Sequence, residues 1–329
     1  MGENIEDKTD LVSFNAEEDA EVEDEVKDER DVINEKPIQP KIQPQLTEEQ
    51  RQSLLGSRKF YYNRVFCILE LVKCCQHKEM AFLSAKGETN KLKYRQLLVE
   101  TYDLWKMITE KIGFQDKLVN VYNSCAIFQD GVIPMSSLNP IRRADSLEYQ
   151  EFNDNAISKM KGYSFLIDVD GENFVDAYNQ AKQVKEIFDE FKLGYYMLNS
   201  SSKGFHFVVE DEYTDPSIKL LDRCAVFGTI AKNIQAIYSD LEGIDTTIYD
   251  FRRIKKVPYS MSCMDRTVCL PLDDTEFNEK LKVHQEKYLL SYNVLARIMI
   301  KNRGLLTRNL ELGEEQLQKN FGKFVEEFK

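Results

Sequence analysis

The sequence predicts an α+β fold in which strands and helices alternate in the middle of the chain and helices flank them at both ends. Apolar residues recur at helical spacing over 47–76 and 92–112. Between 116 and 277, short runs rich in β-branched and aromatic residues are separated by helical patterns. Strands that alternate with helices favour a layered structure over a helical bundle.

Composition limits the kind of protein. The chain of 329 residues is 42% hydrophobic and 30% charged, which is enough apolar material for a substantial core in one or two domains. Its formal net charge is -12, but residues 1–36 contain fifteen acidic and four basic residues, so the rest of the chain is close to neutral. The acidic balance therefore does not exclude a basic groove for a ligand that carries phosphate.

The sequence favours an intracellular location, either cytoplasmic or nuclear. No apolar stretch resembles a signal peptide or reaches the length of about 18 residues that is needed to cross a membrane. The seven cysteines lack paired C-x2-C spacing, which favours reduced thiols over a zinc site.

Four regions follow one another along the chain. Residues 1–45 are acidic and then rich in Pro and Gln, so we expect a disordered acidic tail. Residues 46–115 are expected to form an N-terminal helical layer, which opens with a capping box from Thr47 to Gln50. We expect the core at 116–277 and a further helical segment at 278–329. Within the core, the expected strands are 118–128, 163–169, 195–198 and 205–209, and the expected helices are 177–191 and 217–241.

Two aspartates stand at the end of the strand expected at 163–169. On a strand, Asp168 and Asp170 project from the same face about 7 Å apart, while Val169 packs behind them. Carboxylates placed in this way suit Mg²⁺ or Mn²⁺. The apolar run before them would carry the pair to the carboxyl end of a buried strand, where α/β sheets usually place their sites. A pair of solvated acids is the alternative for this motif taken alone.

A turn that contains serine, lysine and glycine joins the last two of these strands. Ser202, Lys203 and Gly204 can present a hydroxyl, an ammonium group and backbone N–H groups to an anion, and glycine allows close approach of the backbone. His206 follows on the face away from its phenylalanine neighbours. Separately, a plain turn and a structural histidine are the alternatives; their contiguity favours a nucleotide site.

A third segment combines an acid with a basic stretch. Asp245 lies where a helix is expected to give way to a strand, and four basic residues follow it within five positions: Arg252, Arg253, Lys255 and Lys256. Alternate members of this run can face a triphosphate or a nucleic-acid backbone from one side of a strand. Taken alone, the run is also typical of a solvated face.

The order of these segments resembles a known family. Asp-x-Asp, then Ser-x-Lys-Gly-Phe-His, then Ile-Asp followed by Arg-Arg-Ile-Lys-Lys-Val-Pro-Tyr-Ser, is similar to the three signature motifs of the archaeo-eukaryotic primase superfamily, which includes primase small subunits and primase-polymerases. Residues 78–83, 119–124 and 139–143 are similar to segments that precede the first motif in archaeal members. The likeness covers about 58–275. It implies a two-layer primase-polymerase core with an RRM-like mixed sheet, flanked by N- and C-terminal helices.

The resemblance also implies a role for each motif residue. Asp168, Asp170 and Asp245 would be catalytic and would hold two divalent ions, Mg²⁺ or Mn²⁺, which activate a 3′-hydroxyl and stabilise the reacting phosphate. The residues implied to bind the incoming nucleotide are Ser202, Lys203, His206, Arg253 and Lys256. The implied activity is that of a DNA primase or primase-polymerase, which synthesises primers on single-stranded DNA by template-directed nucleotidyl transfer.

Two features depart from the family pattern. No cysteine lies between Asp170 and His206, where replicative small subunits commonly carry a zinc module, so a compact member without zinc is expected. Ser262 stands where the family often has histidine, which leaves that local contact open.

The implied partners are a single-stranded DNA template and NTP or dNTP, and no membrane. A primase large subunit, a helicase or a single-strand-binding protein could join them. Two alternatives to a primase remain: a gap-filling or end-repair polymerase of the same superfamily, and a non-catalytic replication accessory subunit. The presence of all three carboxylates argues against the accessory subunit. The sequence leaves open the choice between ribonucleotides and deoxyribonucleotides, the preferred template and the role of the acidic tail.

Overall fold

The computed structural model describes most of the chain from residue 46 onward. The described ranges are 46–84, 93–97, 99–129, 157–200, 204–263, 267–278 and 307–329. They all belong to one compact unit. The acidic tail expected at 1–45 lies outside the described residues.

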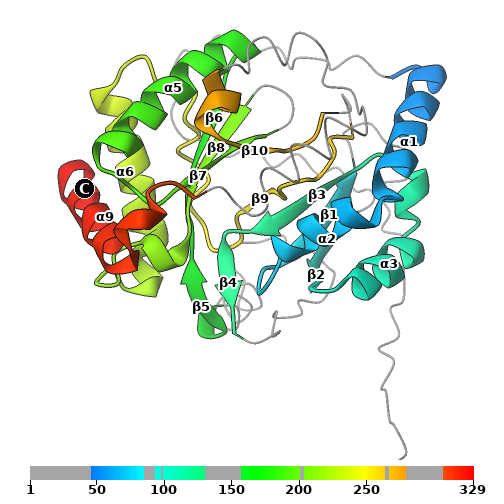
Figure 1. Cartoon of the computed structure of the whole chain (residues 1–329), viewed down its shortest axis with the longest axis horizontal. Coiled ribbons are helices and arrows are strands. Elements are labelled where there is room, and N and C mark those ends of the chain that lie inside the picture. The colour runs from blue at the N-terminus through cyan, green and yellow to red at the C-terminus, as the bar shows by residue number, and fades with distance from the viewer. Residues whose placement is uncertain are drawn as a thin grey trace, which may run out of the picture. The chain divides into compact units, whose positions relative to one another are not determined.

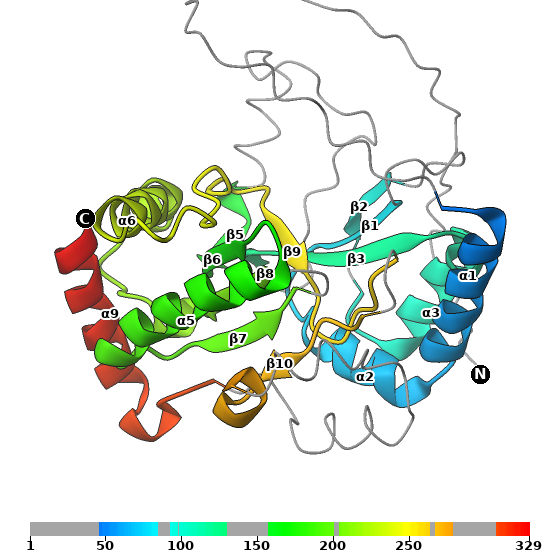
Figure 2. The same cartoon turned by 90° about the horizontal axis from the view of Figure 1, so that it is seen from above.

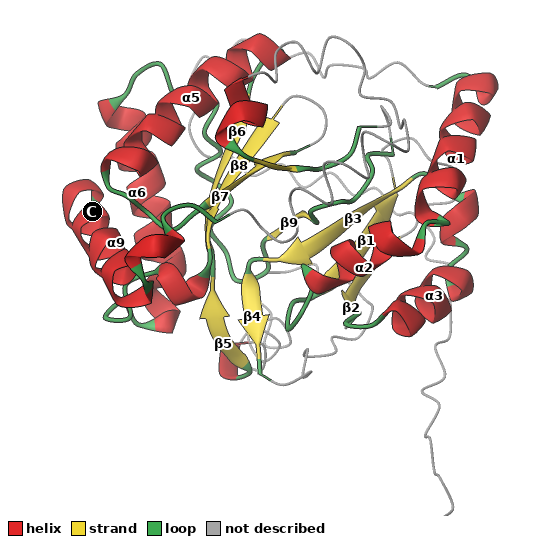
Figure 3. Cartoon of the chain, viewed as in Figure 1, coloured by secondary structure: helices red, strands yellow, loops and turns green. Residues whose placement is uncertain are grey.

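Helices and strands are mixed along this unit (Figure 3). The α-helices whose full length is described are α1 (Glu48–Tyr62), α2 (Val65–Lys73), α3 (Tyr102–Lys111), α5 (Phe174–Glu190), α6 (Arg223–Ile237) and α9 (Glu314–Phe328). The strands are β1 (Met80–Ser84), β2 (Lys93–Leu97), β3 (Val119–Ser124), β4 (Ala126–Phe128), β5 (Met160–Tyr163), β6 (Phe165–Asp170), β7 (Tyr196–Asn199), β8 (Gly204–Val209), β9 (Ile254–Lys256) and β10 (Pro271–Leu272). The predicted α+β class is confirmed.

The first sheet has the strand order β2-β1-β3-β9, and each of these pairings is antiparallel. Alternate residues of β3 face the helices. Val119 and Val121 are buried in a core with Trp105 and Phe114, whereas Tyr122 on the opposite face is only partly buried. Figure 1 shows α1, α2 and α3 gathered beside this sheet.

The segment predicted as a helical layer, 46–115, also contains strands. The sequence predicts helix over 92–112, but the structure has β2 at Lys93–Leu97 and begins a helix only at Tyr102. β2 pairs with β1, so strand pairing overrides the helical spacing of its apolar residues. The helical pattern over 47–76 is confirmed as two helices, and the capping box between Thr47 and Gln50 is present at the start of α1.

The second sheet has the strand order β10-β7-β8-β6. It was expected to be mixed, but the pairings among its described strands are antiparallel. Phe165 and Phe207 are fully buried and share a core with α5, α6 and α9. In Figure 2 both sheets lie between α5, α6 and α9 on one side and α1, α2 and α3 on the other. Each sheet therefore has one face covered by its own helices.

The sequence of α5 provides both an N-terminal cap and an apolar face for the core. The side chain of Asn173 accepts hydrogen bonds from the N–H groups of Val175 and Asp176, which caps the first turn. One apolar stripe, which includes Ala177 and Val184, is buried against the second sheet. The cap and the stripe together fix where α5 begins and which face it turns to the sheet.

A network of charged and polar side chains links the first sheet to the second. Lys78, just before β1, donates to both carboxylate oxygens of Glu210, just after β8, at 2.8 and 2.9 Å. Glu210 also accepts hydrogen bonds from Ser164 at 2.6 Å and from Tyr196 at 2.9 Å. Lys78 is buried and the Glu210 side chain is 15% exposed, so the pair links the first sheet to the second at a mostly enclosed position.

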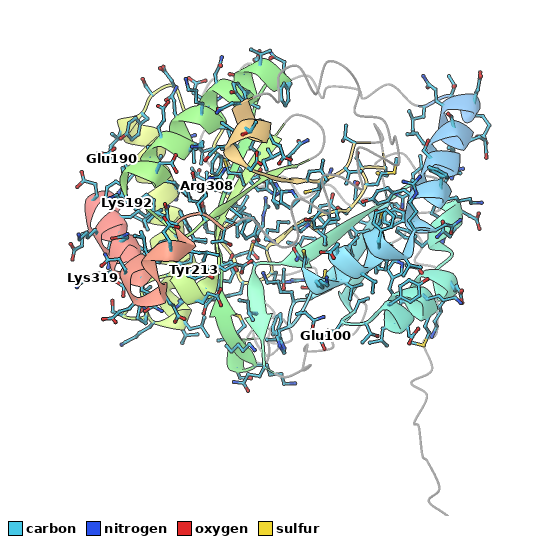
Figure 4. The ribbon with its side chains drawn as sticks, viewed as in Figure 1. Glu100, Glu190, Lys192, Tyr213, Arg308 and Lys319 are labelled. Atoms are coloured by element: carbon cyan, nitrogen blue, oxygen red, sulfur yellow. The ribbon has the colours of Figure 1, made fainter. Side chains whose placement is uncertain are left out.

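Of the C-terminal segment expected to be helical, the structure describes 307–329, where α9 confirms the helix. The backbone N–H of Arg308, labelled in Figure 4, donates to the carbonyl oxygen of Tyr195 at 2.8 Å, and its guanidinium group lies 5.0 Å from the centre of the Tyr195 ring. All seven cysteines are free thiols. None of the described helices combines the length and apolar character needed to span a membrane.

Candidate functional site

The first aspartate of the candidate site faces a histidine across two paired strands. In the antiparallel register of β6 and β8, Asp168 lies opposite His206 and Asp170 lies opposite Gly204. Val169, between the two aspartates, is fully buried, so both carboxylates point to the other face of the sheet. The Nε2 atom of His206 lies 3.3 Å from Oδ1 of Asp168. Strand pairing therefore joins two motifs that are far apart in the sequence.

The third motif is placed beside the first by a short antiparallel bridge between Val169 and Ile244. The N–H of Asp170 donates to the carbonyl oxygen of Gly243 at 2.8 Å, and the N–H of Asp245 donates to that of Asp168 at 3.0 Å. A Cβ atom at position 243 would lie 1.9 Å from the Asp170 carbonyl oxygen, so only glycine permits this approach. The bridge brings Asp245 alongside the end of β6.

The side chains of His206 and Arg253 flank Asp168. Nη2 of Arg253 lies 3.1 Å from Oδ2 of Asp168 and 3.9 Å from Oδ2 of Asp245. Burial by itself would raise the pKa of the Asp168 carboxyl, but His206 and Arg253 outweigh burial and hold that pKa below its usual value. Asp168 is therefore ionised at neutral pH despite being mostly enclosed.

The same two side chains have unused hydrogen-bonding atoms. Within the part of the chain that the structure describes, the buried atoms Nδ1 of His206 and Nε of Arg253 have no hydrogen-bond partner. Buried polar atoms are usually paired, and unpaired ones are common where a ligand binds. An anion could accept a hydrogen bond from Arg253 Nε, and it could accept one from His206 Nδ1 when the imidazole carries a proton on both nitrogens.

The contacts of the carboxylates show which cations they could hold. Three aspartates from adjacent segments offer oxygen ligands of the kind that Mg²⁺ and Mn²⁺ prefer. The guanidinium group of Arg253 already stands between Asp168 and Asp245, so a cation occupies this position. Among the described residues, no group of three or more Asp, Glu, His or Cys side chains has the geometry of a metal site. The donor set fits divalent cations in chemical kind, and Arg253 is the group that has to move aside for them.

The structure brings together four of the residues that the sequence singled out: Asp168, Asp245, His206 and Arg253. Asp170 is the next outward-facing residue of β6, and its carboxylate lies over the position of Gly204. The remaining residues are placed differently. Lys256 lies further along β9, opposite Tyr122, while Ser202 and Lys203 lie outside the described residues.

Sequence reasoning missed three residues that support the site. Thr247 donates both its N–H and its hydroxyl to Oδ1 of Asp245, at 2.9 and 2.7 Å. Gln180 of α5 accepts the N–H of Gly243 at 2.6 Å, and Gln235 of α6 donates to the carbonyl oxygen of Ile244 at 3.2 Å. The available signal for Gln180 was a polar residue within the apolar stripe of its helix.

Neither a scan against protein-family models nor a search of curated proteins finds a match. Solved structures do match. The catalytic domain of primase RepB′ in complex with initiator DNA shares 11% identity at a TM-score of 0.32, over 72% of this chain and 98% of that chain. The polymerase domain of Mycobacterium tuberculosis Ligase D in complex with DNA shares 12% identity at a TM-score of 0.44, over 81% and 92%. The cyanophage S-2L primase-polymerase domain shares 12% identity at a TM-score of 0.35, over 68% and 97%.

These three structures are primase or polymerase domains, and each of their TM-scores lies below 0.5. At this level of similarity, the residues of the site decide what the chain can do.

Proposed function

We propose that the chain is a DNA primase or primase-polymerase, which transfers nucleotides to a growing primer on a single-stranded DNA template. One observation carries this proposal. Three segments that are distant in the sequence meet at Asp168, where His206 and Arg253 flank one carboxylate and Asp245 lies alongside. Carboxylates beside an arginine and a histidine with unpaired hydrogen-bonding atoms suit a ligand that carries both phosphate and a divalent cation.

In this proposal each side chain has a distinct task. Asp168, Asp170 and Asp245 would hold two ions, Mg²⁺ or Mn²⁺, which supply positive charge to the attacking hydroxyl and to the reacting phosphate. Arg253 would donate to a phosphate oxygen through Nε, and His206 would donate through Nδ1 in its doubly protonated form. The small exposure of the Asp168 side chain, 14%, keeps these interactions in a partly desolvated place, where they are stronger than in water.

The remaining assignments rest on the motif resemblance. Ser202 and Lys203 would contact the triphosphate from the turn before β8, and Lys256 would do so from β9. Electrostatic contacts would hold the template backbone, so activity should fall as the salt concentration rises.

The test is nucleotide incorporation on single-stranded DNA with Mg²⁺ or Mn²⁺, with and without a supplied primer, for the wild type and Asp245→Asn. Products on unprimed template that are lost in the variant would establish a primase. Extension only of a supplied primer would favour a gap-filling or end-repair polymerase. Template binding without product under either condition would favour the accessory subunit and contradict the proposal.

Replacing Gly204 by alanine is expected to lower incorporation by about 100-fold, because displacement of a reacting group by about 1 Å can cost that much. The new Cβ would lie 2.4 Å from Oδ1 of Asp170 and would push this carboxylate away from its present position. The rate is measured at saturating nucleotide. Gly56→Ala is the matched control, since a Cβ at that position meets no atom within 4 Å. Equal rates for the two variants would contradict the placing of Asp170 in the site.

Replacing Arg253 by alanine is expected to have two opposite effects. Loss of a charged donor should raise the KM for nucleotide by about 10-fold or more. Removal of the cation between Asp168 and Asp245 should tighten Mn²⁺ binding in the absence of nucleotide. Mn²⁺ affinity is measured by electron paramagnetic resonance. The control is Lys232→Ala, which removes an exposed charge from α6. Weaker Mn²⁺ binding by Arg253→Ala would show that the guanidinium does not compete with metal.

A further inference from the structure

Helix α5 touches both of the segments that carry the aspartates. Its N-terminal turn packs under the end of the first motif, where a Cβ at Gly171 would lie 2.4 Å from the N atom of Ala177. One turn further along, Gln180 contacts the loop that precedes Asp245. The helix thus spans the distance between the two motifs.

The contacts form a continuous chain of hydrogen bonds. The N–H of Glu172, two residues after Asp170, donates to Oδ2 of Asp176 at 2.9 Å. Oδ1 of Asp176 accepts from Nε2 of Gln180 at 3.0 Å, and Oε1 of Gln180 accepts the N–H of Gly243 at 2.6 Å. Each group therefore uses one atom toward the first motif and one toward the third. Gln180 is only 7% exposed, so water cannot easily replace its partners.

We propose that Asp176 and Gln180 are positioning residues that fix Asp245 relative to Asp168 and Asp170. We call the hydrogen-bonded chain from Glu172 through Asp176 and Gln180 to Gly243 the relay. The inference rests on the proposed function, because it takes the carboxylates that the relay aligns to be catalytic. Neither side chain touches the reacting groups. Their effect passes through the loop from Glu242 to Asp245, whose other side is held by Gln235 of α6.

The relay can be tested by exchanging its donor and acceptor groups at positions 176 and 180. Asp176→Asn alone would set an amide donor against the amide donor of Gln180. Gln180→Glu alone would set one carboxylate against another. In the double variant, the new carboxylate at position 180 can accept from both Gly243 and the new amide at position 176, whose oxygen still accepts the N–H of Glu172. The double exchange therefore restores every hydrogen bond with the same net charge.

Two readouts are measured for the wild type, both single variants and the double variant. The first is amide hydrogen exchange in the segment 242–247, which does not depend on any activity. The second is the kcat of nucleotide incorporation well below the Tm of each variant. We expect each single variant to exchange faster in this segment and to lose about 10-fold to 100-fold in kcat, with the KM for primer and template unchanged. The double variant should recover both values to within about threefold of the wild type.

Gln183→Glu is the matched control, because it adds the same charge to a partly exposed position on the same helix. It should change neither readout. Single variants that leave exchange in 242–247 unchanged, or a double variant that fails to fold or to recover exchange, would overturn the relay. Restored exchange without any change in kcat among the variants would reduce the relay to a structural role and overturn the positioning proposal. An inactive wild type would contradict the proposed function, while exchange would still decide whether the relay exists.

Discussion

Replacing Glu210 by glutamine is expected to destabilise the fold by about 3–5 kcal/mol, the usual cost of removing one partner from a buried ion pair. Glu210 accepts from Lys78 at 2.8 and 2.9 Å, from Ser164 at 2.6 Å and from Tyr196 at 2.9 Å. Glutamine has a similar size, but its amide nitrogen would face one of these donors. Lys78, which is only 6% exposed, would keep its charge without a carboxylate.

A second buried lysine increases this dependence on Glu210. Lys255 is 3% exposed and donates to the neutral side chain of Asn123 at 3.1 Å. Burial lowers the pKa of Lys255, the charge of Lys78 lowers it further, and Glu210 acts in the opposite direction. Glu210 therefore favours the charged forms of both lysines, through hydrogen bonds to Lys78 and through its negative charge at Lys255.

The free energy of unfolding is measured by urea denaturation at pH 7. Glu186→Gln serves as the control because the Glu186 side chain is 66% exposed, and it should change stability by less than about 1 kcal/mol. A loss of the same small size in Glu210→Gln would contradict a structural role for the buried network. The double variant Lys78→Met/Glu210→Gln should be more stable than Glu210→Gln, because it removes the stranded charge.

The pH dependence of stability follows from the same carboxylate. Burial would raise the pKa of Glu210, but Lys78 and Lys255 outweigh it and lower the pKa from 4.5 to about 2. Because the folded-state pKa is the lower one, the stabilisation is complete above pH 4.5 and is lost as pH falls toward 2. It amounts to about 3 kcal/mol. In Glu210→Gln, this part of the acid sensitivity should be missing.

Local patterns were sufficient to predict several parts of the fold. The capping box at Thr47 and the apolar stripe of α5 involve residues within one or two turns of each other, so the sequence displays them directly. The strand at Lys93–Leu97 was missed because its stability comes from pairing with β1, which no local pattern reveals. Lys255, read as part of a basic face, is instead enclosed behind its strand.

In the candidate site, too, local patterns predict some features, and others depend on tertiary contacts. That Asp168 and Asp170 share a face follows from the strand period. Their partners do not follow from it, because the pairing of Asp168 with His206 depends on the register of β6 against β8. The contact of Gln180 with Gly243 joins a helix to a loop 63 residues away. Motif order supplied the candidates, and tertiary pairing supplies the contacts between them.

Replacing Asp168 by asparagine is expected to reduce nucleotide incorporation by at least about 1,000-fold, which corresponds to about 4 kcal/mol of transition-state stabilisation. Asparagine keeps the shape of the side chain and removes the charge that His206 and Arg253 now face. Mn²⁺ binding should weaken for the same reason. The control is Asp116→Asn, since the Asp116 side chain is 75% exposed and makes an ion pair with Lys59. It removes the same charge and should leave incorporation unchanged.

The same variant separates a catalytic role from a structural one. Removal of one negative charge cannot weaken electrostatic attraction to DNA, so Asp168→Asn should bind single-stranded template at least as tightly as the wild type at low salt. Fluorescence anisotropy with labelled DNA measures this affinity, and thermal unfolding measures the fold. Lost incorporation with retained template binding, at a temperature well below the Tm of the variant, would place Asp168 in the chemical step. Incorporation within tenfold of the wild type would mean that the carboxylate beside His206 and Arg253 is not the one on which the reaction depends.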